Sequence, residues 1–397
     1  MTLTREQLLL DLYRAYKDAR RHKRRRLYQL QFEYHLEENL LSLCDELYSR
    51  TYRPGTSTCF IIHDPKMREV FAAEFRDRIV HHLFYNYTHV LFERTFIADS
   101  YSCIPGRGTH YGIERLKHHI RSVSRNHTRP CYVLKLDIKG YFMHIRREKL
   151  HALCMESLKR MRHHASDVEG VMWEEKIDYS FVEYLLGVII HADCVKDCRM
   201  MGDERDWERL PADKSLFSSP PGCGLPIGNL SSQLFSNIYL NRFDQYCKRV
   251  LGCRHYGRYV DDVYVVASDK RSLQAWIPAM RTFLNNELGL DFHPHKVCIV
   301  DERMGVEFLG AFVKPFRSYI STASLCRMKR KVGRLKNEDR TGHLEASVNS
   351  FLGVLSHYDS YCLRRLLFTR HSLLKKCGAF NLPVLKFIPN QSLLNFR

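Results

Sequence analysis

Three aspartates carry the chemistry that this sequence most clearly encodes. Asp137 ends an apolar run, and Asp261 and Asp262 stand side by side between two runs of aromatic and β-branched residues. This pattern predicts a strand that ends at Asp137 and a hairpin with the adjacent acids at its tip. Three carboxylates from two strands are ligands that a pair of Mg²⁺ ions requires. Two such ions, roughly 3.5–4 Å apart, stabilise both the attacking and the leaving oxygen of a phosphoryl displacement.

One simpler interpretation of the adjacent acids and one further metal hypothesis stand beside this chemistry. An Asp-Asp pair on its own usually closes a β-turn, and the additional strand-terminal acid, Asp137, is what favours a metal site. A second metal hypothesis rests on zinc-type ligands, although their spacing is not that of a standard zinc finger and they could be ordinary thiols and imidazole. These zinc-type candidates are His191, Cys194, Cys198 and Cys223.

Composition limits the class of protein. The 397 residues include 62 Lys and Arg against 44 Asp and Glu, a net charge of +18, with 45% apolar residues. This usage is typical of a globular chain, and the charge favours a polyanionic partner such as nucleic acid. No apolar stretch is long enough to cross a membrane, and the N-terminus lacks secretory-signal features. We therefore expect a cytoplasmic protein with reduced cysteines and no membrane partner.

The elements that must position the acids follow from periodicity and turn residues. Apolar spacing predicts helices over 5–27, 34–50, 75–92 and 111–123, a mostly helical stretch over 148–202 and a basic helical C-terminal region. β-type runs predict a hairpin over 58–71, a strand over 131–137, a strand pair over 259–267 and a short β-rich piece after 310.

Two basic segments lie near opposite ends of the chain. Residues 17–26, which include Arg24 and Arg25, stand beside tyrosines, a combination that suits a phosphate backbone better than bare solvent. Residues 327–336 carry too many cations for a neutral partner. The cations predicted to contact nucleic acid in this second segment are Arg327, Lys329, Arg330 and Arg334.

Several segments resemble the motifs of reverse transcriptases. Tyr259-Val260-Asp261-Asp262 looks like their Tyr-x-Asp-Asp signature, and residues 136–142 resemble their first palm motif. Residues 224–233 stand where the nucleotide-pocket motif belongs, and residues 305–310 resemble the primer-grip turn. Because these segments come in the family's order, the resemblance covers residues 136–310, and the flanking blocks extend it to most of the chain.

The resemblance is greatest to the bacterial, group II intron-like branch. Residues 75–82 and the loop 106–110 fit that branch. The pocket motif departs from the intron pattern Gln-Gly-x-x-x-Ser-Pro, because it runs from Ile227 to Gln233 as Ile-Gly-Asn-Leu-Ser-Ser-Gln. That variant resembles the enzymes of diversity-generating retroelements and of defence-associated reverse transcriptases.

The resemblance also implies roles for individual residues. Asp137, Asp261 and Asp262 would hold two Mg²⁺ ions, or Mn²⁺ in their place, with the backbone carbonyl of Ile138. Phe142 would lie under the sugar ring and exclude a 2′-hydroxyl, the alternative being an ordinary core phenylalanine. The other side chains implied to contact the nucleotide are Lys66, Arg68, Arg76, Gln233 and Lys296, the last of which could also be a solvated surface lysine. Arg107 and Tyr259 are implied to contact nucleic acid.

The resemblance implies an α+β, right-hand polymerase fold with an antiparallel palm sheet and an α-helical thumb. The expected divisions are a basic helical extension (1–49), fingers (50–130), the first part of the palm (131–160), a helical or irregular insert (161–221), the second part of the palm (222–315) and the thumb with the C-terminal tail (316–397).

The implied activity is RNA-directed DNA synthesis by two-metal nucleotidyl transfer. The expected partners are a structured noncoding or template RNA, the cDNA product, dNTPs, and an accessory protein or second reverse transcriptase. Anti-phage defence and retroelement diversification remain alternative roles. A maturase-like RNA-binding protein whose catalysis is absent or secondary remains the alternative function, and intact Asp137, Asp261 and Asp262 favour the enzyme.

Overall fold

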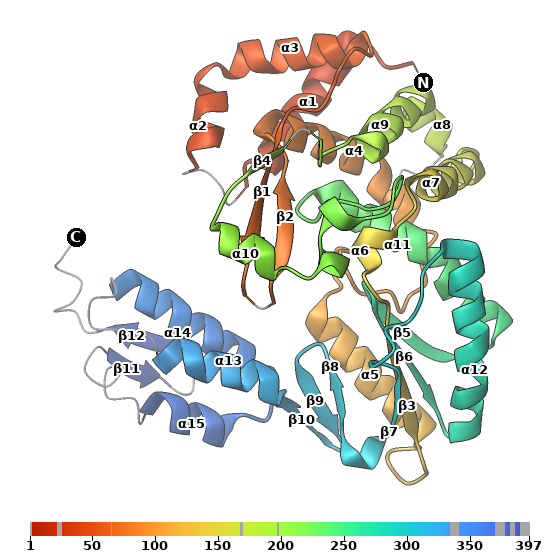
Figure 1. Ribbon diagram of the computed structural model, residues 1–397, viewed down its shortest axis with the longest axis vertical. Helices are drawn as coiled ribbons and strands as arrows, with labels where there is room; N and C mark the ends of the chain where they lie inside the picture. The colour runs from red at the N-terminus through yellow and green to blue at the C-terminus, as the bar shows by residue number, and fades with distance from the viewer. Residues whose placement is uncertain are drawn as a thin grey trace. The chain divides into compact units, whose positions relative to one another are not determined.

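The computed structural model describes residues 2–21, 26–64, 66–166, 170–196, 198–333, 341–369, 378–381 and 386–389. The chain forms two compact units (Figure 1). The first unit contains residues 1–106, 136–263 and 274–297, and the second contains residues 107–135, 264–273 and 298–397. The three aspartates all belong to the first unit. The sixfold division expected from the sequence stays a prediction.

Helix α4 (Phe75–Glu93) is the central helix of the first unit. Its apolar residues recur at helical spacing, and Ile79, Leu83 and Phe84 are buried against the surrounding helices α1, α7, α9 and α11. The other helices of this unit are α1 (Arg5–Ala19), α2 (Leu27–Tyr34), α3 (Leu36–Tyr48), α6 (Tyr141–His144), α7 (Arg147–Met161), α8 (Trp173–Lys176), α9 (Tyr179–His191), α10 (Glu204–Arg209) and α11 (Leu230–Gln245).

The prediction of one helix over residues 5–27 is wrong in its extent. Helix α1 ends at Ala19, and α2 begins at Leu27 as a separate helix. The basic residues that follow Ala19 carry no apolar periodicity that could bury a further helical turn, which explains why the first helix stops there.

A three-stranded sheet with the order β2-β1-β4 lies in the first unit. Strands β1 (Ser57–Ile62) and β2 (Arg68–Ala72) pair antiparallel, which confirms the predicted hairpin. Strand β4 (Cys198–Met200) pairs parallel with β1 in a region that the sequence predicted to be helical or irregular. The buried carboxylate of Glu69 on β2 accepts hydrogen bonds from Ser215 Oγ (2.7 Å) and Leu216 N (2.8 Å) and so anchors the insert to this sheet.

Strands β3 (Tyr132–Asp137), β5 (His255–Tyr259), β6 (Asp262–Ala267) and β7 (Cys298–Asp301) form a sheet with the order β5-β6-β3-β7, and β3 pairs antiparallel with β7. The predicted strand over 131–137 and the predicted strand pair around the acids are confirmed. Helix α12 (Lys270–Phe283) follows β6. Shorter 3₁₀ turns cover Ala212–Lys214, Leu216–Ser218 and Glu302–Met304, and π-helical turns cover Tyr246–Val250 and Leu284–Leu288.

The second unit combines helices with small antiparallel sheets. Helix α5 (Thr109–Val123) belongs to it, as does a sheet of β8 (Val306–Phe308), β9 (Ala311–Lys314) and β10 (Arg317–Ile320) with the order β10-β9-β8. Helices α13 (Thr322–Gly333), α14 (Thr341–Leu355) and α15 (Tyr361–Thr369) follow, with an apolar core that includes Met328, Leu352 and Phe387. A hairpin of β11 (Gly378–Asn381) and β12 (Lys386–Pro389) corrects the expectation of a purely helical C-terminal region. The α+β class is confirmed.

Candidate active site

The turn between β5 and β6 presents the adjacent acids. Val260 occupies the left-handed region at φ 55°, a conformation that a β-branched side chain disfavours. Such strain persists only where surrounding contacts hold it, and it is concentrated at functional sites. The turn directly precedes Asp261 and Asp262, so the strained residue sets the direction of both carboxylates.

A buried arginine holds this turn. Arg258 is fully buried, and its Nη1 donates a 2.9 Å hydrogen bond to the carbonyl of Val260. Its Nε and Nη2 donate to the two carboxylate oxygens of Asp244, each at 2.7 Å. Asn237 Oδ1 and Ser100 Oγ accept further bonds at 3.3 Å. The guanidinium is thus fixed on several sides while one of its nitrogens restrains the strained peptide.

The third aspartate lies at the end of β3, where a short stretch of backbone pairing fixes its position. The carbonyl of Asp137 accepts a 2.7 Å hydrogen bond from His293 N, and Lys139 N donates to the carbonyl of Asp291 at 2.9 Å. These two bonds flank the antiparallel bridge between Ile138 and Phe292 and leave the carbonyl of Ile138 outside the bridge. Lys296 Nζ lies 2.8 Å from Asp137 Oδ2.

The three carboxylates influence one another electrostatically. Burial, together with the negative charges of Asp262 and Asp137, raises the pKa of Asp261 to about 6, and Arg68 opposes that shift. Repulsion of this kind is relieved when a cation binds, and carboxylate oxygens are the ligands that Mg²⁺ prefers. Among the residues that the structure describes, no group of three or more His, Cys, Asp and Glu side chains is already assembled as a metal site. The donor chemistry therefore fits a divalent cation, although the carboxylates do not form a finished cage.

The predicted nucleotide-pocket motif runs between two elements of the first unit. Leu225 N donates to the carbonyl of Phe142 (2.9 Å), and the carbonyl of Ile227 accepts from Phe71 N on β2 (2.8 Å). Gly228 has φ 133°, and a Cβ there would lie 2.5 Å from the Phe71 carbonyl oxygen, so only glycine fits this approach. Phe142 is half-buried and packs with Ile227 against an apolar cluster.

A half-buried histidine connects this motif to α4. His81 Nδ1 and Ser231 Oγ are 2.7 Å apart. Burial lowers the pKa of His81 to about 4, so the imidazole is neutral near pH 7. A neutral ring that shares a hydrogen bond with the first turn of α11 positions that helix without adding charge to the site.

The residues that were predicted to contact the nucleotide have different surroundings in the structure. Arg68 lies at the exposed start of β2 and is the cation of this group whose charge acts on Asp261. Lys66 is exposed in the preceding turn, and Gln233 is exposed in the first turn of α11. Arg76 instead forms an ion pair with Glu46 (2.5 Å), and its guanidinium lies over the ring of Tyr52.

The residues predicted to contact nucleic acid occupy different parts of the chain. Arg24, Arg25 and Arg334 lie outside the described residues. Tyr259 is half-buried at the end of β5, and Arg107 is half-buried in the loop before α5. On α13, Arg327 is half-buried, and Lys329 and Arg330 are exposed.

The zinc hypothesis gains no support within the described residues. His191 Nδ1 lies 3.8 Å from Glu148, and Cys198 Sγ donates to the carbonyl of Val195. Burial raises the pKa of the Cys194 thiol to about 12. No metal group is found among the described His, Cys, Asp and Glu side chains.

Sequence reasoning missed the network around Arg258. Its partners come from two segments: Ser100 lies in the loop before α5, and Asn237 and Asp244 both lie on α11. A signal in the sequence is the position of Arg258 itself, a charged residue directly before the predicted strand pair over 259–267 and two residues before Val260.

Comparison with known proteins identifies the family. The profile of the reverse transcriptase (RNA-dependent DNA polymerase) family matches residues 63–313, so the chain belongs to that family. Protein YkfC of Escherichia coli (strain K12) is 25% identical over 312 residues, which cover 69% of this chain and 71% of YkfC. Reverse transcriptase domains use divalent metal ions, in agreement with the carboxylate chemistry of the site.

Two solved telomerase structures are also similar. The apo telomerase of Candida tropicalis truncated from its C-terminal domain has a TM-score of 0.46 and 11% identity, with 72% of this chain and 60% of that chain covered. The telomerase of Candida albicans in complex with a fragment of telomeric RNA has a TM-score of 0.47 and 12% identity, with 83% and 56% covered. The chain thus spans less than two thirds of either telomerase chain.

In the described residues, no helix has both the length and the apolar character needed to cross a membrane.

Proposed function

We propose that this protein is an RNA-directed DNA polymerase that copies an associated template RNA into cDNA. The observation that carries the proposal is the convergence of three carboxylates: Asp137 ends β3, and Asp262, directly after Asp261, begins the neighbouring strand β6, close enough for their charges to act on one another. A site that concentrates three carboxylates beside a strained turn is suited to bind divalent cations and the triphosphate that they accompany. Membership of the reverse transcriptase family supports the same activity.

The proposed mechanism assigns a task to each side chain. Asp137, Asp261 and Asp262 would hold two Mg²⁺ ions, or Mn²⁺, with the carbonyl of Ile138. Bound cations supply activation of the primer 3′-oxygen and stabilisation of the leaving pyrophosphate. Arg68, whose charge acts on Asp261, binds the triphosphate, whereas the pairing of Arg76 with Glu46 gives Arg76 a structural task. Lys296, now 2.8 Å from Asp137, supplies a proton donor for the leaving group. Phe142 excludes a 2′-hydroxyl.

The test is primer extension on an RNA template. Asp261→Asn combined with Asp262→Asn removes two negative charges with almost no change in volume, so incorporation should fall by at least about a thousandfold. Asp269→Asn is the matched control, because that carboxylate is exposed and caps its own turn through Ser272. If the double variant still extended the primer at the wild-type rate, the catalytic assignment would be wrong.

A second candidate function is RNA binding without essential catalysis, as in a maturase-like protein. Its supporting observation is the cationic surface of α13 and the net charge of +18. The two functions separate experimentally. Wild-type protein that binds RNA and incorporates no dNTP with either Mg²⁺ or Mn²⁺ would support the binding protein and contradict the polymerase.

The template is proposed to be a structured noncoding RNA that stays bound in the cytoplasm. The described cysteines form no disulfide with one another, which suits a reducing compartment. Purification of the protein followed by sequencing of the bound RNA should give one dominant species, and a random cellular mixture would overturn the proposal. Defence and diversification both remain proposed roles. A neighbouring variable repeat with an accessory protein gene would favour diversification, and a second polymerase gene would favour defence.

A further inference from the structure

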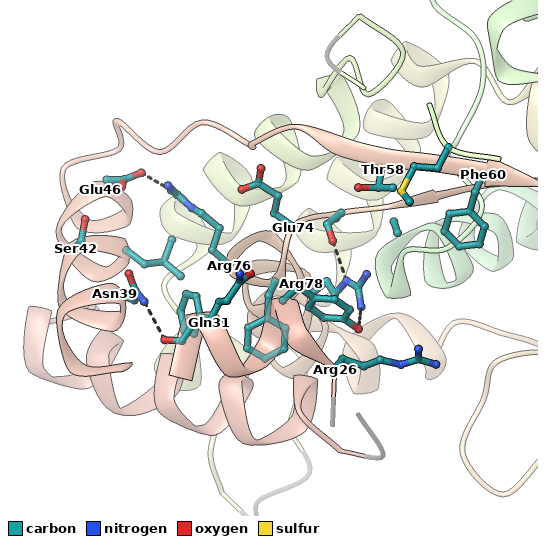
Figure 2. A pocket seen from close by; sticks show the side chains of 17 residues that line it. Arg26, Gln31, Asn39, Ser42, Glu46, Thr58, Phe60, Glu74, Arg76 and Arg78 are labelled. Carbon is teal, nitrogen blue, oxygen red and sulfur yellow. Dashed lines mark hydrogen bonds and ion pairs between the residues drawn. The ribbon is translucent and has the colours of Figure 1, made fainter. Parts of the chain in front are cut away.

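A groove of about 1180 Å³ lies in the first unit, away from the three aspartates in sequence and built from different elements. Its walls come from α2, α3, the β1–β2 hairpin and the start of α4 (Figure 2). The mechanism proposed above uses none of its side chains for catalysis. Its volume exceeds that of most small-molecule sites, which are about 300–1000 Å³, and suits a longer, flexible ligand.

Planar groups form one wall of the groove. The guanidinium of Arg78 lies over the ring of Tyr28, 4.8 Å from its centroid, and Arg78 Nη1 donates to the Tyr28 hydroxyl at 2.9 Å. Phe75 packs against Tyr28 with 6.2 Å between ring centroids and edge-on against Phe32 at 5.2 Å. Tyr28 is 39% exposed although it is a large aromatic side chain. This wall therefore offers a rigid flat surface on which another planar group can stack.

Polar groups in the groove are left for a ligand. Arg26 and Gln31 are exposed and make no hydrogen bond or ion pair with the described residues, whereas Asn39 Nδ2 already donates to the carbonyl of Phe32. The charge of Arg76 is neutralised by Glu46, and Figure 2 shows these two side chains directed at each other. Arg26 ends the basic segment 17–26 and thus provides a free cation at the rim, beside neutral amide donors and acceptors.

We propose that this groove binds unpaired nucleotides, by stacking of a base against the Tyr28 wall and contact of its phosphate with Arg26. Stacked aromatic and arginine planes combined with amide groups recognise unpaired bases, whereas a lipid or an apolar peptide would leave the exposed amide of Gln31 and the cation of Arg26 unsatisfied. The nucleotide source is either a single-stranded part of the RNA partner or a free nucleotide. The proposal rests on the proposed function only for the identity of that RNA.

The test measures binding in the absence of catalysis. The Asp261→Asn, Asp262→Asn double variant serves as the parent protein, and the probe is a fluorescein-labelled single-stranded RNA of about ten nucleotides. Adding Tyr28→Leu should weaken binding roughly tenfold, because leucine fills similar space without a stacking face. Tyr34→Leu is the matched control, since Tyr34 is on the same helix, is 84% exposed and does not line the groove.

A second pair of variants examines the phosphate contact. Arg26→Gln should weaken binding and flatten its salt dependence, whereas Arg14→Gln, which removes a cation from the exposed face of α1, should do neither. Competition with AMP distinguishes the sources: displacement of the RNA by AMP assigns the groove to mononucleotides, and displacement only by unlabelled single-stranded RNA assigns it to the RNA partner.

Each outcome is separable from the polymerase proposal. Equal affinities for the Tyr28→Leu and Tyr34→Leu proteins would overturn the groove proposal while primer extension by the wild-type protein still stood. Equal competition by a base-paired RNA of the same length would also overturn it, because a duplex has no free base face to stack.

Discussion

At the scale of single residues, we expect Arg258, a buried charge, to influence catalysis through the turn that carries Asp261 and Asp262. It restrains the carbonyl of Val260 from within a buried network, and Val260 determines where Asp261 and Asp262 point. Arg258→Lys keeps the charge and loses the planar fork, so the Val260 peptide is released. We expect kcat for dNTP incorporation to fall roughly tenfold with little change in KM.

Rescue separates this positioning role from a general loss of stability. Glycine adopts positive φ without strain, so Val260→Gly in the Arg258→Lys background should recover most of kcat. Arg254→Lys is the control, because that side chain is exposed. A double variant that is no more active than Arg258→Lys alone would remove the positioning role, whatever the folding stability of either protein.

In the absence of metal, Asp261 should make the free energy of unfolding decrease as pH rises. Its pKa in the folded protein, about 6, lies above the ordinary value of 3.8, so the folded state binds the proton more tightly than the unfolded state. Stability should therefore decline as pH rises from about 4 to about 6, by on the order of 1–2 kcal/mol at this partly exposed group. Urea unfolding in EDTA measures it, and Asp261→Asn should abolish the decline.

Asp269 supplies a control of opposite sign. Hydrogen bonds from the Ser272 side chain and backbone lower the pKa of Asp269, so its contribution is present at neutral pH and is lost as pH falls through that lowered pKa. Asp269→Asn should therefore leave the decline between about pH 4 and pH 6 in place. Addition of Mg²⁺ should reduce the decline in the wild-type protein, and a decline unaffected by Asp261→Asn would assign it to another group.

At the scale of elements, one close approach fixes the nucleotide-pocket motif against β2. Gly228→Ala combines a positive φ with a Cβ 2.5 Å from a carbonyl oxygen of the backbone, which cannot move aside as a side chain could. We expect a loss of about 2 kcal/mol or more in the free energy of unfolding, with reduced dNTP affinity.

The matched substitution is Gly187→Ala in α9. Nothing lies within 4 Å of the added Cβ there, and alanine favours the helix, so we expect stabilisation of about 0.5–1 kcal/mol. Chemical denaturation of both variants tests the pair. Equal effects of the two substitutions would show that the 228 backbone does not depend on its contact with Phe71.

The sequence predicted correctly those elements that depend on short patterns along the chain. Turn residues and periodicity predicted the β1–β2 hairpin, α4 and the strand that ends at Asp137. The apolar runs beside the three acids predicted that these acids lie at a strand end and at a hairpin tip. Strand β4 is only three residues long and exists because β1 lies alongside it, and the Arg258 network joins segments far apart in sequence. Such features depend on tertiary contacts, which one sequence without relatives does not encode in any short window.

At the scale of the whole molecule, the net charge of +18 explains RNA binding only when the lysines and arginines that contact phosphates are identified. Each phosphate neutralised by a lysine or arginine releases counterions, so the slope of log affinity against log salt counts the contacts made. Removal of Arg327, Lys329 and Arg330 as glutamines should reduce that slope by about two for an RNA–DNA duplex substrate, because at least two of these cations are exposed on α13.

The matched triple variant changes Lys159, Lys270 and Arg271 to glutamine, which alters net charge equally on elements outside the predicted contact surface. If long-range attraction alone governed affinity, both triples would weaken binding alike at low salt and converge at high salt. If α13 contacts the phosphate backbone of the duplex, only the triple variant on α13 changes the slope of log affinity against log salt, and the difference persists across the salt range. Filter binding of the duplex at several salt concentrations decides between them, and identical slopes would remove α13 from the nucleic-acid interface.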